Sequence, residues 1–133
     1  MTKTYQGSCH CGALRFAAEI DLARGTLRCN CSICAKLRFW PAIVAPAAFR
    51  LLAGAAILAD YQFLARRDHH FFCPHCGVHA FGTGTSPRWG AFYAVNLACL
   101  DDATPAELAA APVTWIDGKN DQWDSAPAFT AHL

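Results

Sequence analysis

The chain has 133 residues, of which 54% are hydrophobic, and 11 Lys and Arg residues against 10 Asp and Glu residues leave a net charge of +1. A nucleic-acid partner requires a basic surface, and a membrane-spanning helix requires about 20 uninterrupted apolar residues. The most apolar stretch, residues 39–59, is interrupted by Pro41, Pro46, Arg50 and Gly54. We therefore expect neither nucleic acid nor membrane as a partner, and a single domain over residues 1–133.

The first predicted strand covers residues 13–20. Its apolar side chains alternate with polar ones, so that Leu14, Phe16, Ala18 and Ile20 share one face, which is the pattern of a half-buried strand. Five further segments are short and rich in aromatic or β-branched residues, at residues 39–44, 57–63, 69–73, 78–82 and 91–97. The sequence therefore predicts a mainly β fold.

One short helix is predicted over residues 104–111. Thr104 can cap its N-terminus, Pro105 suits the first helical position, and Glu107 completes a capping box. Residues 116–120 then read as a turn.

Eight cysteines and the absence of an apolar leader indicate a cytoplasmic protein whose thiols bind metal and do not form disulfides. Seven of the eight fall into three groups along the chain: Cys9 and Cys11; Cys29, Cys31 and Cys34; and Cys73 and Cys76.

The first and last groups can complete one zinc site. Cys9 and Cys11 point to the same side of an extended segment, and a tight turn containing Pro74 lets Cys73 and Cys76 reach one ion. Four thiolates form a closed, tetrahedral structural site of the zinc-ribbon kind. The alternative of buried free thiols or a thioredoxin-like redox pair is disfavoured because the cysteines cluster.

The middle group supplies three ligands, which is the number found in catalytic zinc sites that keep one position open. A histidine can instead close the site, and five candidates lie in or near the other cysteine groups: His10, His69, His70, His75 and His79. In another arrangement, Cys9 and Cys11 share an ion with two middle cysteines, which leaves Cys73 and Cys76 without a role.

Other residues, near the middle cysteines and farther along the chain, are given roles in the same interpretation. The negative charge of three thiolates on one ion can be offset by Arg28, Lys36 and Arg38. Cys99 follows an apolar strand and is interpreted as a small buried residue. Near the C-terminus, the predicted solvated loop offers further candidates for lining a pocket: Lys119, Asp121 and Trp123.

Four sequence segments carry a resemblance to a known family: GSCHCGALRF, CNCSICAK, FFCPHCG and VNLACLDD, in this order. They resemble the glutathione-dependent formaldehyde-activating family, which also contains centromere protein V. The resemblance implies a β-tent (Mss-like) fold of antiparallel sheets. It also implies two zinc ions per chain, a structural one on Cys9, Cys11, Cys73 and Cys76 and a second on Cys29, Cys31 and Cys34, and it favours the open form of the second site.

The resemblance further implies carbon-sulfur lyase chemistry, in which the thiol of glutathione adds to formaldehyde and gives S-hydroxymethylglutathione. Two alternatives are a thiol carrier without turnover and a structural zinc module for protein contacts. The sequence departs from the family pattern at Asn30, where a histidine is common, and in residues 35–40.

Overall fold

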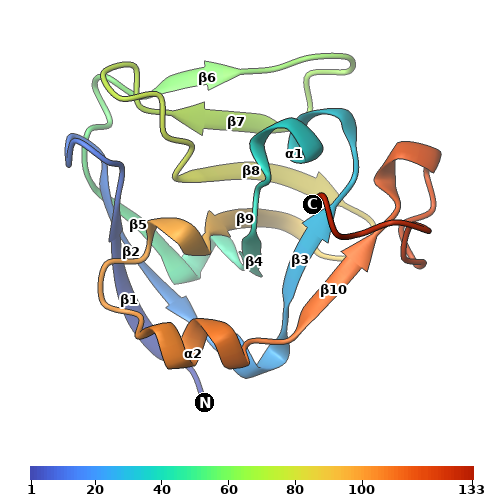
Figure 1. Ribbon diagram of the computed structural model, residues 1–133. Coiled ribbons are helices and arrows are strands. Elements are labelled where there is room, and N and C mark those ends of the chain that lie inside the picture. The colour runs from blue at the N-terminus through green and yellow to red at the C-terminus, as the bar shows by residue number, and fades with distance from the viewer.

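The computed structural model describes residues 1–133 and contains three sheets (Figure 1). The first sheet has the order β1 (Lys3–Ser8), β2 (Arg15–Ile20) and β5 (Phe49–Ala53). The second pairs β10 (Val113–Ile116) with β3 (Thr26–Cys29). The third has the order β4 (Pro41–Val44), β9 (Gly90–Asn96), β8 (Phe81–Ser86), β7 (His69–Phe72) and β6 (Ala59–Tyr61).

The mainly β prediction is confirmed, with two additions. All pairs in the first and third sheets are antiparallel, whereas β3 and β10 run parallel. The expectation of one helix was wrong, because α1 (Ser32–Leu37) precedes the predicted α2 (Pro105–Ala110). Four single-turn 3-10 helices lie at Leu22–Arg24, Pro46–Ala48, Leu97–Cys99 and Gly118–Asn120. None of the helices is long and apolar enough to cross a membrane.

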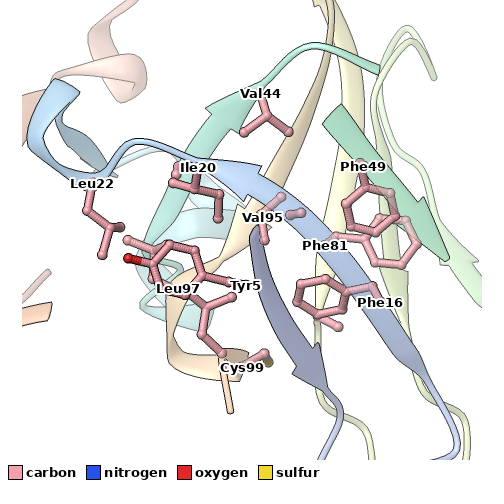
Figure 2. Packing of buried hydrophobic residues seen from close by; sticks show 14 of the residues in the cluster. Tyr5, Phe16, Ile20, Leu22, Val44, Phe49, Phe81, Val95, Leu97 and Cys99 are labelled. Carbon is pink, nitrogen blue, oxygen red and sulfur yellow. The ribbon is translucent and has the colours of Figure 1, made fainter. Parts of the chain in front are cut away.

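The core lies between the three-stranded and the five-stranded sheets. Phe49 of β5 joins them, with its ring 5.4 Å from that of Phe16, 4.6 Å from that of Phe81 and 4.5 Å from that of Tyr93. Figure 2 shows Phe16, Phe49 and Phe81 grouped in this way. Because these side chains come from four different strands, their packing fixes the two sheets relative to each other.

The helix α2 fastens β1 to the rest of the molecule. Its predicted capping box is present: the side chain of Thr104 accepts from the backbone of Glu107, and the Glu107 carboxylate accepts from the backbone of Thr104. The same carboxylate accepts hydrogen bonds from Lys3 and Tyr5 of β1, each at 2.9 Å. The strand that leads to Cys9 is therefore held at its beginning.

The parallel pair of β3 and β10 brings residues 29–31 next to residues 116–119. The side chain of Asn30 donates to Asp117 at 2.7 Å and accepts from the backbone N–H of Lys119 at 2.9 Å. Asparagine is suited to position 30 because its side-chain amide can donate to Asp117 and accept from Lys119 at the same time.

Candidate metal centre and cavity

The first and last cysteine groups meet in space. The ligand atoms of Cys9, Cys11, Cys73 and Cys76 all lie within 4.8 Å of one another. The Cys11 sulfur lies 3.7 Å from that of Cys9 and 3.6 Å from that of Cys73. Four sulfurs placed about 2.3 Å from a tetrahedral zinc ion would lie about 3.8 Å apart, so the spacing and donor set fit zinc.

Two similar turns present these thiols. The backbone N–H of Cys9 donates to Leu14 O at 3.1 Å, and that of Cys73 donates to Val78 O at 3.0 Å. Each turn contains a glycine with positive φ, Gly12 at 82° and Gly77 at 77°. The expectation that Cys9 and Cys11 lie on an extended segment was wrong, because β1 ends at Ser8 and the chain turns back toward β2.

Backbone N–H groups point at the sulfurs of this four-thiol cluster. The N–H of Leu14 donates to the Cys9 sulfur at 3.2 Å. Hydrogen bonds from the N–H groups of Cys11 and Val78 lower the pKa of Cys76 to about 6. Metal-bound sulfur is deprotonated, and these donors stabilise that form.

The three middle cysteines occupy the junction between β3 and α1. Cys29 ends the strand, Cys31 is the residue before the helix, and Cys34 lies in its first turn. Hydrogen bonds from the thiols of Cys31 and Cys34 lower the pKa of Cys29 to about 3. The pKa of Cys34 is raised, first by its contact with Cys29. The backbone N–H of Cys31 also donates to the sulfur of Cys29, at 3.4 Å.

The two groups differ in compactness. The four-thiol cluster is the only set of three or more Cys, His, Asp or Glu side chains whose ligand atoms all lie within 4.8 Å of one another. No histidine belongs to that set. The prediction of two zinc ions thus has support at one site, and the second ion stays a prediction.

The three-thiol cluster lies in a cavity of about 670 Å³. Of the 30 residues that line it, 17 are hydrophobic. Most of the 30 come from β3, α1, β4, β7, β8 and β9, from the β6–β7 loop and from residues 116–123. Figure 1 shows α1 in front of β7 and β8, on the side where this cavity lies. A second cavity of about 450 Å³ has no cysteine in its lining.

The cations of the cavity differ from those predicted. Arg28 does not line the cavity, because Leu27 and Cys29 occupy the cavity face of β3 and Arg28 points to the other face. Its guanidinium lies 5.1 Å from the ring centre of Trp40. Lys36 and Arg38 are also absent from the lining, whose Arg and Lys residues are Arg66, Arg67 and Lys119.

Other sequence expectations hold at this site. Lys119, Asp121 and Trp123 line the cavity as predicted. Cys99 is 7% exposed and stays outside both clusters. The sequence reasoning missed the contribution of residues 63–68, although the cationic segment between two predicted strands was a signal for a functional loop.

Two residues constrain the cluster from opposite sides. A Cβ atom on Gly118 would lie 2.7 Å from the sulfur of Cys29 and 2.9 Å from the ring of Trp123, so a side chain there would displace one of these groups. Across the cavity, His70 donates through Nδ1 to the carbonyl of Tyr61 at 2.8 Å. Because a carbonyl oxygen only accepts, Nδ1 carries a proton in this bond, and in the neutral ring Nε2 is then the acceptor.

Predominantly antiparallel sheets, a cluster of four thiols with the spacing of a metal site and a cavity containing three more thiols define a cysteine-rich β protein. Residues 4–117 match the sequence model of the glutathione-dependent formaldehyde-activating enzyme family. The chain belongs to this family, as its cysteine segments predicted.

Among solved structures, the chain is similar to a protein of Rhodobacter sphaeroides known from a crystal structure. The two are 32% identical with a TM-score of 0.69, and the match covers 82% of this chain and 99% of the other.

Proposed function

We propose that the chain is a zinc-dependent enzyme of the carbon-sulfur lyase type, which joins a glutathione-type thiol to a small aldehyde. Family membership supports the substrate pair. The observation that carries the proposal is the placement of Cys29, Cys31 and Cys34 inside a cavity large enough for a small-molecule substrate. The reducing conditions that glutathione requires agree with eight free cysteines and a cytoplasmic location.

The two cysteine clusters have different roles in this proposal. Cys9, Cys11, Cys73 and Cys76 hold a structural zinc ion that completes one domain over residues 1–133. The three-thiol cluster holds a second zinc ion, for which its donor set of three soft sulfur ligands is suitable. When bound there, zinc offers an open coordination position and lowers the pKa of a thiol that enters it.

The reaction is an addition in which atoms and charge balance. The sulfur of the thiol attacks the carbonyl carbon, a C–S bond forms, and the π electrons of the C=O bond move to oxygen. The proton lost by the thiol ends on this oxygen, which gives the S-hydroxymethyl product. No oxidant or reductant is required.

We assign the transfer of that proton to His70. Its Nδ1–H is fixed on the Tyr61 carbonyl, so that Nε2 can accept the thiol proton and return it to the new hydroxyl group. The ring stacks on Phe63 at a centroid distance of 5.3 Å, which limits its rotation. His70 also lines the same cavity as the three thiols.

The test follows consumption of formaldehyde and glutathione by NMR, with a reaction without protein as the baseline. Cys31→Ser is the informative variant, because Cys31 is the N-cap of α1 and has no side-chain capping bond, and serine is a preferred N-cap residue. The variant removes a thiol and favours the local fold. Cys99→Ser is the matched control, since Cys99 lies outside both clusters.

We expect the wild type and Cys99→Ser to accelerate the addition, and Cys31→Ser to react at the baseline rate. Equal rates in all four samples would rule out the enzyme. Calorimetry then identifies a thiol carrier, which would bind glutathione in a Cys31-dependent manner without changing the rate.

A further inference from the structure

The cavity beside the three thiols is larger and more apolar than a one-carbon aldehyde requires. Its volume is about 670 Å³ and 17 of its 30 lining residues are hydrophobic. Formaldehyde has no apolar group that such a lining could bind. The shape and chemistry of the cavity therefore carry information about the carbonyl substrate.

Small residues open the cavity on its sheet side. On β9, Tyr93 and Val95 pack into the core, so that the intervening Ala94 faces the opposite side. Ala94 pairs across the sheet with Gly82 of β8 and Ile43 of β4, and all three line the cavity. Gly82 cannot carry a side chain, because a Cβ atom would lie 2.7 Å from the carbonyl oxygen of His69.

Aromatic rings form the walls beside this floor. Phe92 lies across Gly84, where a Cβ atom would come within 2.7 Å of its ring, and the ring of Trp89 meets it edge-on at 5.4 Å. Phe63 stacks on His70 on the neighbouring side. Rings held by such contacts are suitable for binding an apolar group in a fixed orientation.

The charged lining residues come from segments outside the sheet, and only the carboxylate of Asp68 reaches it, beside Gly84 and Phe92. All of them are exposed, on the β6–β7 loop or on the segment after β10: Arg66, Arg67, Asp68, Lys119 and Asp121. A thiol substrate with carboxylates finds its counter-charges there. Ala94, Gly82 and Ile43 themselves offer no polar side chain to a substrate, and the nearest charge is the Asp68 carboxylate beside Gly84.

We propose that the carbonyl substrate carries an aliphatic or aromatic group of several carbons, which binds over Ala94 and Gly82 between Phe63 and Phe92. The proposal rests on the proposed function and narrows its substrate class. The thiol adds to the carbonyl carbon as with formaldehyde, and the product is a hemithioacetal with an apolar substituent. Bonds and protons balance in the same way.

Calorimetry with stable thioethers tests the binding without turnover. S-methylglutathione and S-hexylglutathione carry the same charges and differ only in apolar length. One buried methylene strengthens binding about fourfold, so we expect S-hexylglutathione to bind at least about tenfold more tightly. Equal affinities, or no binding of either compound, would overturn the proposal.

Ala94→Phe tests whether the hexyl group binds over Ala94, because the added ring fills this part of the cavity from a rigid strand. Thr85→Val is the matched control on β8, since Thr85 is exposed and does not line the cavity. We expect Ala94→Phe to reduce the hexyl-to-methyl affinity ratio about tenfold and the control to preserve it. If Ala94→Phe does not fold, Phe92→Ala removes a wall and should reduce the same ratio; an unchanged ratio would contradict the assignment.

Rates with glutathione and an aldehyde series separate the two proposals. The acceleration over the uncatalysed rate should increase from formaldehyde through propanal to pentanal. Acceleration of formaldehyde alone would overturn the substrate class and leave the proposed function standing. Absence of acceleration with every aldehyde, together with selective binding of the hexyl compound, would instead overturn the proposed function.

Discussion

The two cysteine clusters use the same side chain in different surroundings. In the four-thiol cluster, two turns converge, Cys9 and Cys73 are buried, and the sulfur spacing matches a tetrahedral zinc site. The three-thiol cluster comes from one short segment, is half-buried, and lies in a cavity. The number of converging segments thus distinguishes a site that ties the chain together from one that receives a ligand.

The surroundings enforce this difference. Cys9 and Cys73 pack around Leu14, which is fully buried, so the four-thiol cluster has its own small apolar core. The three-thiol cluster instead faces Gly118, whose missing side chain makes room for the sulfur of Cys29. We therefore expect damage at the first cluster to affect stability and damage at the second to affect reaction or binding.

The largest effect is predicted for Cys73→Ser. Cys73 is 0% exposed and lies within the four-thiol cluster, so the variant loses a zinc ligand and buries a hydroxyl group in its place. We expect a loss of about 4 kcal/mol or more in the free energy of unfolding, measured by denaturant titration. Zinc content should fall in parallel.

Cys99→Ser provides the comparison for this loss, because Cys99 is also buried but binds no metal in our account. It should retain the zinc of the wild type. An equal loss of zinc in both variants, or full zinc in Cys73→Ser, would show that the four-thiol cluster is not a metal site.

The next effect concerns the reaction alone. His70→Phe keeps a ring that can stack on Phe63 but removes the proton-accepting nitrogen. We expect the rate of thiol addition to fall about 100-fold, with glutathione affinity by calorimetry changed less than threefold. Loss of affinity and rate together would assign His70 to binding and not to proton transfer.

Gly118→Ala should affect the three-thiol cluster selectively. The added methyl group meets the sulfur of Cys29 and the ring of Trp123, which displaces the thiol from its position. We expect about a tenfold loss of activity and no loss of the structural zinc. Thr114→Ala, on the exposed side of the adjacent β10, is the control and should behave as the wild type.

The smallest effect is predicted for Glu107 of α2, whose carboxylate accepts hydrogen bonds from Lys3 and Tyr5 and so holds β1, the strand that precedes Cys9. Contacts with the backbone of Thr104 and with Lys3 lower the pKa of Glu107 to about 2, from an ordinary value of 4.5. Its charge therefore stabilises the fold above pH 4.5, and this contribution is lost as the pH falls toward 2. Glu107→Gln preserves the capping box and removes the charge.

The melting temperature of Glu107→Gln should be slightly lower than that of the wild type at neutral pH, and the two should converge as the pH falls from 4.5 to 2. A difference in melting temperature that stays constant across this range would show that the charge of Glu107 does not contribute to holding β1.

The sequence was informative where a local rule was sufficient. Thr104, Pro105 and Glu107 predicted α2 because a capping box is a local pattern, and alternation predicted β2 because one face of that strand is buried. Cysteine spacing predicted which thiols meet because few residue types bind zinc. The first two features depend on neighbours in the chain, whereas the meeting of the thiols joins segments about 60 residues apart and was predictable only because zinc selects cysteine.

Other features that depend on distant contacts were missed. The strand β3 pairs with β10, and its four residues show no alternation that could reveal a partner so far away. The helix α1 has six residues and no side-chain cap, so its formation depends on tertiary contacts. Arg66 and Arg67 were missed as cavity residues because the β6–β7 loop is adjacent to α1 only in space.

The division of the thiols into a closed four and an open three is tested most directly by crystallography at the zinc absorption edge, with glutathione added. Our account predicts two anomalous peaks per chain, one surrounded by Cys9, Cys11, Cys73 and Cys76, and one bound by Cys29, Cys31, Cys34 and the sulfur of glutathione. A single peak, a disulfide among the middle thiols, or a second ion whose fourth ligand is a histidine would contradict it.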